Sequence, residues 1–143
     1  MSYRLFLLDG MAIAYRSYFA FANAPLVNSR GEDTGAVFGF ANTLLKILRE
    51  HKPEYLAVVF DTSAPTFRHE LHAEYKATRD KMPEPLAAQL PRIRQLAGAL
   101  RLPVLEQPGY EADDLIGTMA VRAAAEGLEV TVVSGDKDFM QLI

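Results

Sequence analysis

Short apolar runs in this chain are repeatedly followed by acidic residues, and segments long enough for a helix separate them. The runs with their following acids are 5–8 with Asp9, 56–60 with Asp61, and 130–134 with Asp136 and Asp138. Apolar runs that alternate with helix-length segments are typical of buried parallel strands joined by helical crossovers. Because the carboxyl ends of such strands meet at one edge of the sheet, we expect these acids to gather there.

The order of elements predicts an α/β fold with a mostly parallel central sheet flanked by helices. We expect strands at about 3–8, 55–60, 103–105 and 129–134, and helices at about 11–21, 34–48, 84–100 and 112–126, with one more helix after the last strand. Asp33 or Thr34 is a suitable cap for the second helix, and Gly127 a natural stop for the fourth. On the second helix, the apolar stripe expected to face the core is Val37, Phe38, Ala41, Leu44, Leu45 and Leu48.

A second acidic group stands where the helix at 112–126 is expected to begin. One acid in a first turn is ordinary, since the helix dipole stabilises it by ~0.3–1 kcal/mol. Glu111, Asp113 and Asp114 exceed that need and repel one another. Pro108 and Gly109 predict a turn immediately before them, so we expect Glu111 to lie in the loop.

Seven carboxylates are therefore expected near one edge of the sheet: Asp9, Asp61, Glu111, Asp113, Asp114, Asp136 and Asp138. An aspartate after a single strand often only starts a turn or caps a helix. A group of them is different, because crowded carboxylates need cations. Hard divalent cations with oxygen ligands are the obvious candidates, and a phosphate-containing substrate bound to those cations is the next inference.

Composition narrows the class of protein. The chain has 143 residues, which indicates one domain, and no cysteine, which excludes disulfides and thiolate metal sites. No apolar stretch reaches the ~18 residues of a membrane span, and no signal-peptide pattern is present, so we expect a cytoplasmic protein without a membrane partner. The net charge is −3, but taking the seven carboxylates from the 18 acidic residues leaves 11 against 15 basic ones. That balance of +4 is compatible with a polyanionic partner.

A polar segment at 67–83 is much longer than the usual connection of ~2–6 residues between a strand and a helix. Within it, Lys76 and Arg79 are three residues apart and can project from one helical turn, and Tyr75 can stack on a base. A solvated helix face explains the same pattern. Arg16, which follows Asp9 by two helical turns, either meets a phosphate or pairs with a carboxylate, and its aromatic neighbours Tyr15, Tyr18 and Phe19 are attributed mostly to core packing.

Several motifs occur in the order found in a known family. They are Leu7-Leu8-Asp9-Gly10 with Tyr15-Arg16, Phe67-Arg68-His69-Glu70, Tyr75-Lys76-Ala77-Thr78-Arg79, Gly109-Tyr110-Glu111-Ala112-Asp113-Asp114 and Ser134-Gly135-Asp136-Lys137-Asp138. On these residues the chain resembles the 5′-nuclease (flap endonuclease) family over nearly its whole length. The resemblance is strongest to the amino-terminal 5′→3′ exonuclease domains of bacterial DNA polymerases of type I.

The resemblance implies a PIN-like, or resolvase-like, nuclease core that hydrolyses DNA phosphodiester bonds in replication and repair. It assigns all seven carboxylates to metal binding, with two Mg²⁺ or Mn²⁺ ions in the complete protein. It places a helical arch at about 62–83 and makes Lys76 and Arg79 catalytic. The residues it implies for DNA contacts are Arg16, Arg68, Tyr75, Lys76 and Arg79. The implied partners are DNA with a free 5′ end or a 5′ flap and a covalently linked polymerase domain.

Two alternatives remain beside the nuclease. Family members continue with a further metal motif and a helix-hairpin-helix-like region, so we expect this chain to be part of a longer protein. A DNA-binding fragment without turnover is therefore one alternative. A PIN-type ribonuclease, which also gathers acids at strand ends, is the other, although the arch segment disfavours it.

Overall fold

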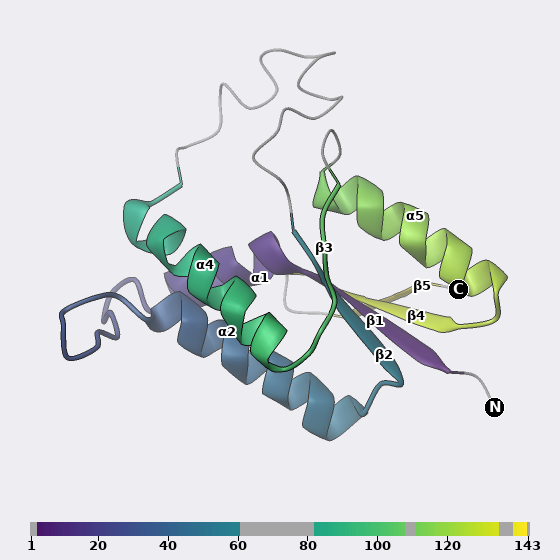
Figure 1. The fold of residues 1–143 in the computed structure, drawn as a ribbon, viewed down its shortest axis with the longest axis horizontal. Helices are drawn as coiled ribbons and strands as arrows, with labels where there is room; N and C mark the ends of the chain where they lie inside the picture. The colour runs from purple at the N-terminus through teal and green to yellow at the C-terminus, as the bar shows by residue number, and fades with distance from the viewer. Residues whose placement is uncertain (1–2, 61–81, 108–110, 135–138, 143) are drawn as a thin grey trace, which may run out of the picture.

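The computed structural model describes residues 3–60, 82–107, 111–134 and 139–142, the last of these by their backbone alone. Within these ranges the chain forms one sheet with helices on both faces (Figure 1). The strands are β1 (Arg4–Asp9), β2 (Tyr55–Val59), β3 (Val104–Leu105), β4 (Glu129–Val133) and β5 (Phe139–Leu142). The helices are α1 (Gly10–Ala20), α2 (Gly35–Lys46), the short π-helical turn η1 (Ile47–His51), α4 (Glu84–Ala99) and α5 (Ala112–Ala125). None of these helices has the length and apolarity needed to cross a bilayer.

The strands lie in the order β3-β2-β1-β4-β5. The first four are parallel, which confirms the predicted mostly parallel sheet, and β5 is antiparallel to β4. The predicted helix after the fourth strand is wrong, because residues 139–142 form β5 instead. A run of four residues carries too little periodicity to separate a strand from a helix, and here the edge of β4 supplies the hydrogen-bonding partner.

The direction of strand addition reverses at β1. From β1 the chain adds β2 and β3 on one side, and it then returns to place β4 on the other side. Helices α1, α2 and α4 lie together on one face of the sheet, while α5 covers the opposite face (Figure 1). In open α/β sheets, ligands bind beyond the carboxyl ends of the strands where the order reverses. In this fold that position lies between the ends of β1 and β4.

Both faces of the sheet are buried, and successive strand residues serve different cores. Phe6 and Leu8 of β1 pack into the core under α1, α2 and α4, whereas Leu7 packs into the core under α5. The same alternation holds in β2, where Val58 faces the first core and Val59 the second. This period of two on a continuous apolar run is the pattern of a central parallel strand.

The apolar stripe predicted for α2 is partly wrong. Phe38 is 49% exposed and Leu45 41% exposed. Leu44 is buried as predicted, and Val37 and Leu48 pack against the core. Ala36, Phe40 and Ile47 are buried as well, although the predicted stripe did not include them. The rotation of the helix is set by its close approach to α1, since a Cβ added at Gly39 would lie 2.6 Å from the Cβ atom of Ser17.

The first turn of α2 is capped from two directions. Thr34 is the N-cap residue but makes no side-chain capping bond, and the Oδ1 atom of Asp33 accepts a hydrogen bond from the Gly35 backbone N–H at 2.9 Å instead. The Val37 N–H donates to the Oε1 atom of Gln89, a buried side chain of α4, at 3.1 Å. Because the first N–H groups of a helix lack partners within it, these two bonds stabilise the start of α2 and tie it to α4.

Candidate active site at the carboxyl edge of the sheet

A hollow of about 490 Å³ opens at the point where the strand order reverses. Residues from β1, α1, α5 and the end of β4 line it: Asp9, Ala12, Tyr15, Arg16, Phe19, Asp113 and Ser134. Ser134 is level with Asp9, because the preceding residues Leu8 and Val133 are paired across β1 and β4. The predicted gathering of strand ends is therefore present for the part of this edge that the structure describes. We call this cavity the acidic hollow.

Asp9 belongs at once to the strand, the helix and the hollow. It is the last residue of β1, and its Oδ1 atom accepts a hydrogen bond from the Ala12 N–H at 3.1 Å, which caps α1. The next residue has to be glycine in this packing, because a Cβ on Gly10 would lie 2.6 Å from the ring of Phe60. The change from strand to helix is thus immediate, and it fixes the Asp9 carboxylate at the edge of the sheet.

The three acids at the start of α5 have different environments. Glu111 is the residue before the helix, with an extended backbone (φ −82°, ψ 160°), which confirms its predicted place outside the helix. Its side chain is buried, with 6% of its surface exposed, while Asp113 is exposed and Asp114 half-buried. Among the three, Asp113 lines the acidic hollow. The structure therefore brings Asp113 to the same hollow as Asp9, although the two residues are far apart in the sequence.

Oxygen ligands for a metal are present in the hollow, but the described residues do not complete a cluster. No three histidine, aspartate or glutamate side chains among them stand close enough together to hold an ion. Asp61, Asp136 and Asp138 lie outside the described residues. Two carboxylates in an open, polar hollow do fit Mg²⁺, which keeps several waters and is bound through one or two carboxylates together with substrate phosphates. The donor set is accordingly that of a hard cation.

Arg16 and two aromatic rings form the α1 side of the hollow. Ala12, Tyr15, Arg16 and Phe19 follow Asp9 at helical spacing and so share one face of α1. The rings of Tyr15 and Phe19 are stacked with their centroids 6.3 Å apart. Tyr15 and Tyr18 pack against the core, as predicted for most of these aromatics, whereas Phe19 is 57% exposed. The helical spacing from Asp9 is the signal that identifies this face from the sequence.

The remaining predicted site residues fall outside the described ranges. These are Arg68, Tyr75, Lys76 and Arg79, together with most of the predicted arch at about 62–83. Their roles stay predictions.

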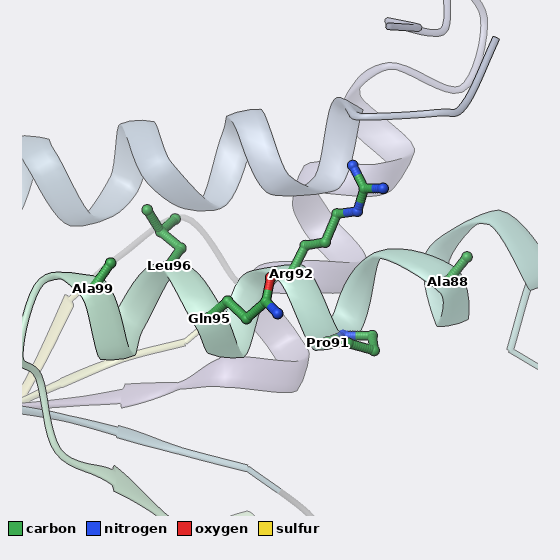
Figure 2. Close-up of a pocket in the computed structure, with 6 residues that line it drawn as sticks. All are labelled: Ala88, Pro91, Arg92, Gln95, Leu96 and Ala99. Carbon is green, nitrogen blue, oxygen red and sulfur yellow. The ribbon is translucent and has the colours of Figure 1, made fainter. Parts of the chain in front are cut away.

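A separate hollow of about 650 Å³ lies along the outer side of α4 (Figure 2). All six residues that line it come from this one helix. Its charged member, Arg92, pairs with Glu32 at 3.3 Å. A shallow surface of this kind, with a cation that already has a carboxylate partner and with no acid in its lining, lacks the donor set found in the acidic hollow.

Comparison with known proteins identifies the family. Residues 4–143 match the family of 5′-3′ exonuclease N-terminal, resolvase-like domains. The chain is 50% identical over 139 residues to DNA polymerase I of Chloroflexus aurantiacus, covering 97% of this chain and 15% of that protein. It is 42% identical over 139 residues to a 5′-3′ exonuclease of Aquifex aeolicus, covering 97% of this chain and 47% of that one. The chain therefore spans less than half the length of either relative.

The fold has solved counterparts as well. A crystal structure of the bacteriophage T5 D15 flap endonuclease with DNA and metal ions matches 94% of this chain and 49% of its own, with a TM-score of 0.63 and 22% sequence identity. At that identity the likeness concerns the fold alone, and it agrees with the predicted resolvase-like core. The family assignment rests on the match over nearly the whole chain: this chain belongs to the family of 5′-3′ exonuclease N-terminal, resolvase-like domains.

Proposed function

We propose that this chain is a metal-dependent 5′→3′ exonuclease or 5′-flap endonuclease domain that hydrolyses DNA phosphodiester bonds. The observation that carries the proposal is the shared lining of one hollow by Asp9, Asp113 and Arg16, at the switch point of a sheet of this family. The two carboxylates suit the binding of metal ions, and the metal ions together with the Arg16 guanidinium suit the binding of an anionic substrate. The domain would act within a DNA polymerase I-type protein, as in the Chloroflexus relative.

The acidic and basic residues of the acidic hollow would have different roles. Asp9 and Asp113 would hold a divalent ion, with Asp61, Glu111, Asp114, Asp136 and Asp138 as the further ligands that the sequence implies. When bound, two Mg²⁺ or Mn²⁺ ions would supply Lewis-acid chemistry, namely activation of a water nucleophile and stabilisation of the leaving oxygen. The T5 structure of the same fold contains metal ions and DNA, which supports a metal cofactor and a DNA substrate.

Arg16 would offset the charge that develops on the phosphate, as a fixed cation at a reaction centre does. Lys76 and Arg79 would add to that effect from the arch, where Arg68 and Tyr75 would contact the strand. Phe19 and Tyr15 offer stacked rings at the rim, and stacking tolerates any base. Recognition would then depend on the shape of the DNA and its free 5′ end rather than on base sequence.

The test is cleavage of a 5′-flap duplex by the intact protein, with Mg²⁺ and with EDTA. We expect cleavage in Mg²⁺ and none in EDTA. We expect Asp113→Asn to lower the cleavage rate by a factor of about 10²–10³, which is the usual cost of removing one charge-stabilising group from a reaction centre. Asp33→Asn is the matched control, because Asp33 bonds the first turn of α2 and does not line the hollow, and asparagine caps equally well.

Three results would contradict the proposal. Binding without cleavage in Mg²⁺ would favour a DNA-binding domain without turnover. Faster cleavage of an RNA strand than of the DNA flap would favour a PIN-type ribonuclease. Full activity of Asp113→Asn would remove this hollow from the reaction.

A further inference from the structure

A second, smaller hollow lies beside the acidic one and shares two of its residues. It measures about 240 Å³, lies between α1 and α2 at the end of β4, and includes Arg16 and Ser134. Its volume is below the ~300–1,000 Å³ of sites for drug-sized ligands. The space therefore suits a short piece of a longer chain molecule that also passes through the acidic hollow.

The second hollow has an apolar floor and a cationic rim. Ile13, Ile47 and Val133 form the floor, and each is buried. The exposed side chains of Arg16 and Lys46 bring two positive charges to the rim. Neither cation has an ion pair with any residue that the structure describes. An apolar floor suits a sugar ring, and the rim suits a phosphate.

Hydrogen-bond donors on the rim come from α2. The Asn42 side chain offers an amide with two N–H donors. The hydroxyl of Thr43 already donates to the Gly39 carbonyl at 3.1 Å, so Thr43 contributes to the wall rather than to an anion. Asn42 and Lys46 are four residues apart and therefore lie on one face of the helix.

Tight packing holds the two walls in place. Gly39 of α2 approaches α1 so closely that an added Cβ would lie 2.6 Å from the Cβ atom of Ser17. Ser17 follows Arg16, and Asn42 lies one turn after Gly39, so this contact fixes the spacing between the rim groups. A preorganised pair of walls binds an anion at a lower entropic cost than two mobile surface chains.

The position of Lys46 is not explained by helix capping. Cations favour the last turn of a helix because the carbonyl end of the dipole attracts them, and the effect falls off within that turn. Here α2 continues without a break into η1, which ends at His51. Lys46 thus stands more than a turn before the helical segment ends, where the dipole attracts it little.

We propose that this second hollow binds a backbone phosphate of the DNA, next along the strand from the phosphate that enters the acidic hollow, with Lys46, Asn42 and Arg16 as its ligands. The inference rests on the proposed nuclease function and deepens it. Arg16, which lines both hollows, lies between the two phosphates. Lys46 would help to bind the DNA strand and to set its position along the two hollows. Arg16 would help to bind the strand and would also stabilise charge at the reacting phosphate.

The test is the salt dependence of flap-duplex binding by the intact protein in EDTA, followed by fluorescence anisotropy. Each phosphate contact contributes about 0.9 to the slope of log K against log salt for duplex DNA and about 0.7 for single strands. We expect Lys46→Gln to make the slope less steep by the contribution of one phosphate contact, whatever the base sequence. In cleavage assays we expect the same variant to raise KM and leave kcat unchanged. Lys46→Arg should keep the slope, and unchanged thermal unfolding shows that each variant folds.

Lys52→Gln is the matched control, since Lys52 is an exposed lysine just before β2, at the opposite edge of the sheet. Equal slopes for the wild type and Lys46→Gln would overturn the second hollow as a phosphate site. An equal drop for Lys46→Gln and Lys52→Gln would overturn it too, because net charge alone would then explain both. Neither result touches the nuclease proposal, which the Asp113→Asn cleavage test decides separately.

Discussion

The Oδ1 atom of Asp9 accepts a hydrogen bond from the Ala12 backbone N–H at 3.1 Å, while the same carboxylate lines the acidic hollow. One side chain thus caps α1 and supplies charge to the candidate site. The two roles need different properties, because capping needs only an acceptor oxygen whereas binding a cation needs the negative charge. Substitutions can therefore separate them.

We expect Asp9→Asn to keep the fold and lose cleavage. Asparagine caps a helix about as well as aspartate, so the variant loses only the attraction of the charge to the helix dipole, ~0.3–1 kcal/mol. Asp9→Ala loses the cap as well, at a typical cost of ~1 kcal/mol. Urea denaturation and flap cleavage measured on both variants check this. Cleavage by Asp9→Asn at the wild-type rate would show that the charge has no part in the reaction.

Gly10 is predicted to be intolerant of even one added carbon. A Cβ at this position would lie 2.6 Å from the ring of Phe60, which is fully buried and stacked on Phe40 with centroids 6.3 Å apart. The ring has little room to move, so we expect Gly10→Ala to lower the free energy of unfolding by ~1–3 kcal/mol, as overpacking does.

Gly117 provides the matched control. It lies inside α5 with nothing within 4 Å of an added Cβ, so Gly117→Ala should stabilise the protein by ~0.5–1 kcal/mol through helix propensity. A double-mutant cycle of Gly10→Ala with Phe60→Leu should recover part of the loss, because leucine leaves space for the methyl group. Equal effects of the two alanine substitutions would contradict the packing argument.

The parallel sheet was predictable because its residues are locally consistent with it. The run before Asp61 is apolar on both faces, as a strand with helices on each side requires, and Gly127 (φ +90°) ends α5 as its position suggested. The α2 stripe was only partly predictable. Apolar residues surround much of that helix, and its rotation is decided by the contact of Gly39 with Ser17, which no local pattern encodes.

The candidate site, like the fold, was predictable where local sequence determines it and not where tertiary packing does. Asp9 could be found because it ends an apolar run, and Asp113 because it belongs to an acidic helix start. Lys46 and Asn42 gave no such signal, since a polar pair on an otherwise apolar helix reads as its solvated face. They border a hollow only because α1 and α2 pack closely and β4 ends between them. Information of that kind belongs to the tertiary structure.

The junction between β1 and β2 predicts how stability depends on pH. The Oε1 atom of Glu54 accepts a hydrogen bond from the Arg4 backbone N–H at 2.7 Å, and the Arg4 side chain adds a weaker contact at 3.4 Å. Chiefly the backbone hydrogen bond, and then the side-chain one, lower the pKa of Glu54 from its usual 4.5. A carboxylate whose pKa is lower in the folded than in the unfolded state stabilises the fold above the unfolded value, and that contribution disappears as pH falls through the folded value.

We therefore expect Glu54→Gln to be less stable than the wild type at neutral pH, with the difference shrinking below about pH 4.5 as the wild-type carboxylate takes up its proton. Urea midpoints measured at neutral pH and at about pH 3 give this difference directly. Arg4→Lys is the informative control: it keeps the backbone N–H that makes the larger contribution, so most of the pH dependence should survive in it. A Glu54→Gln difference that stays constant across this range would show that the hydrogen bond to Arg4 does not favour the charged carboxylate.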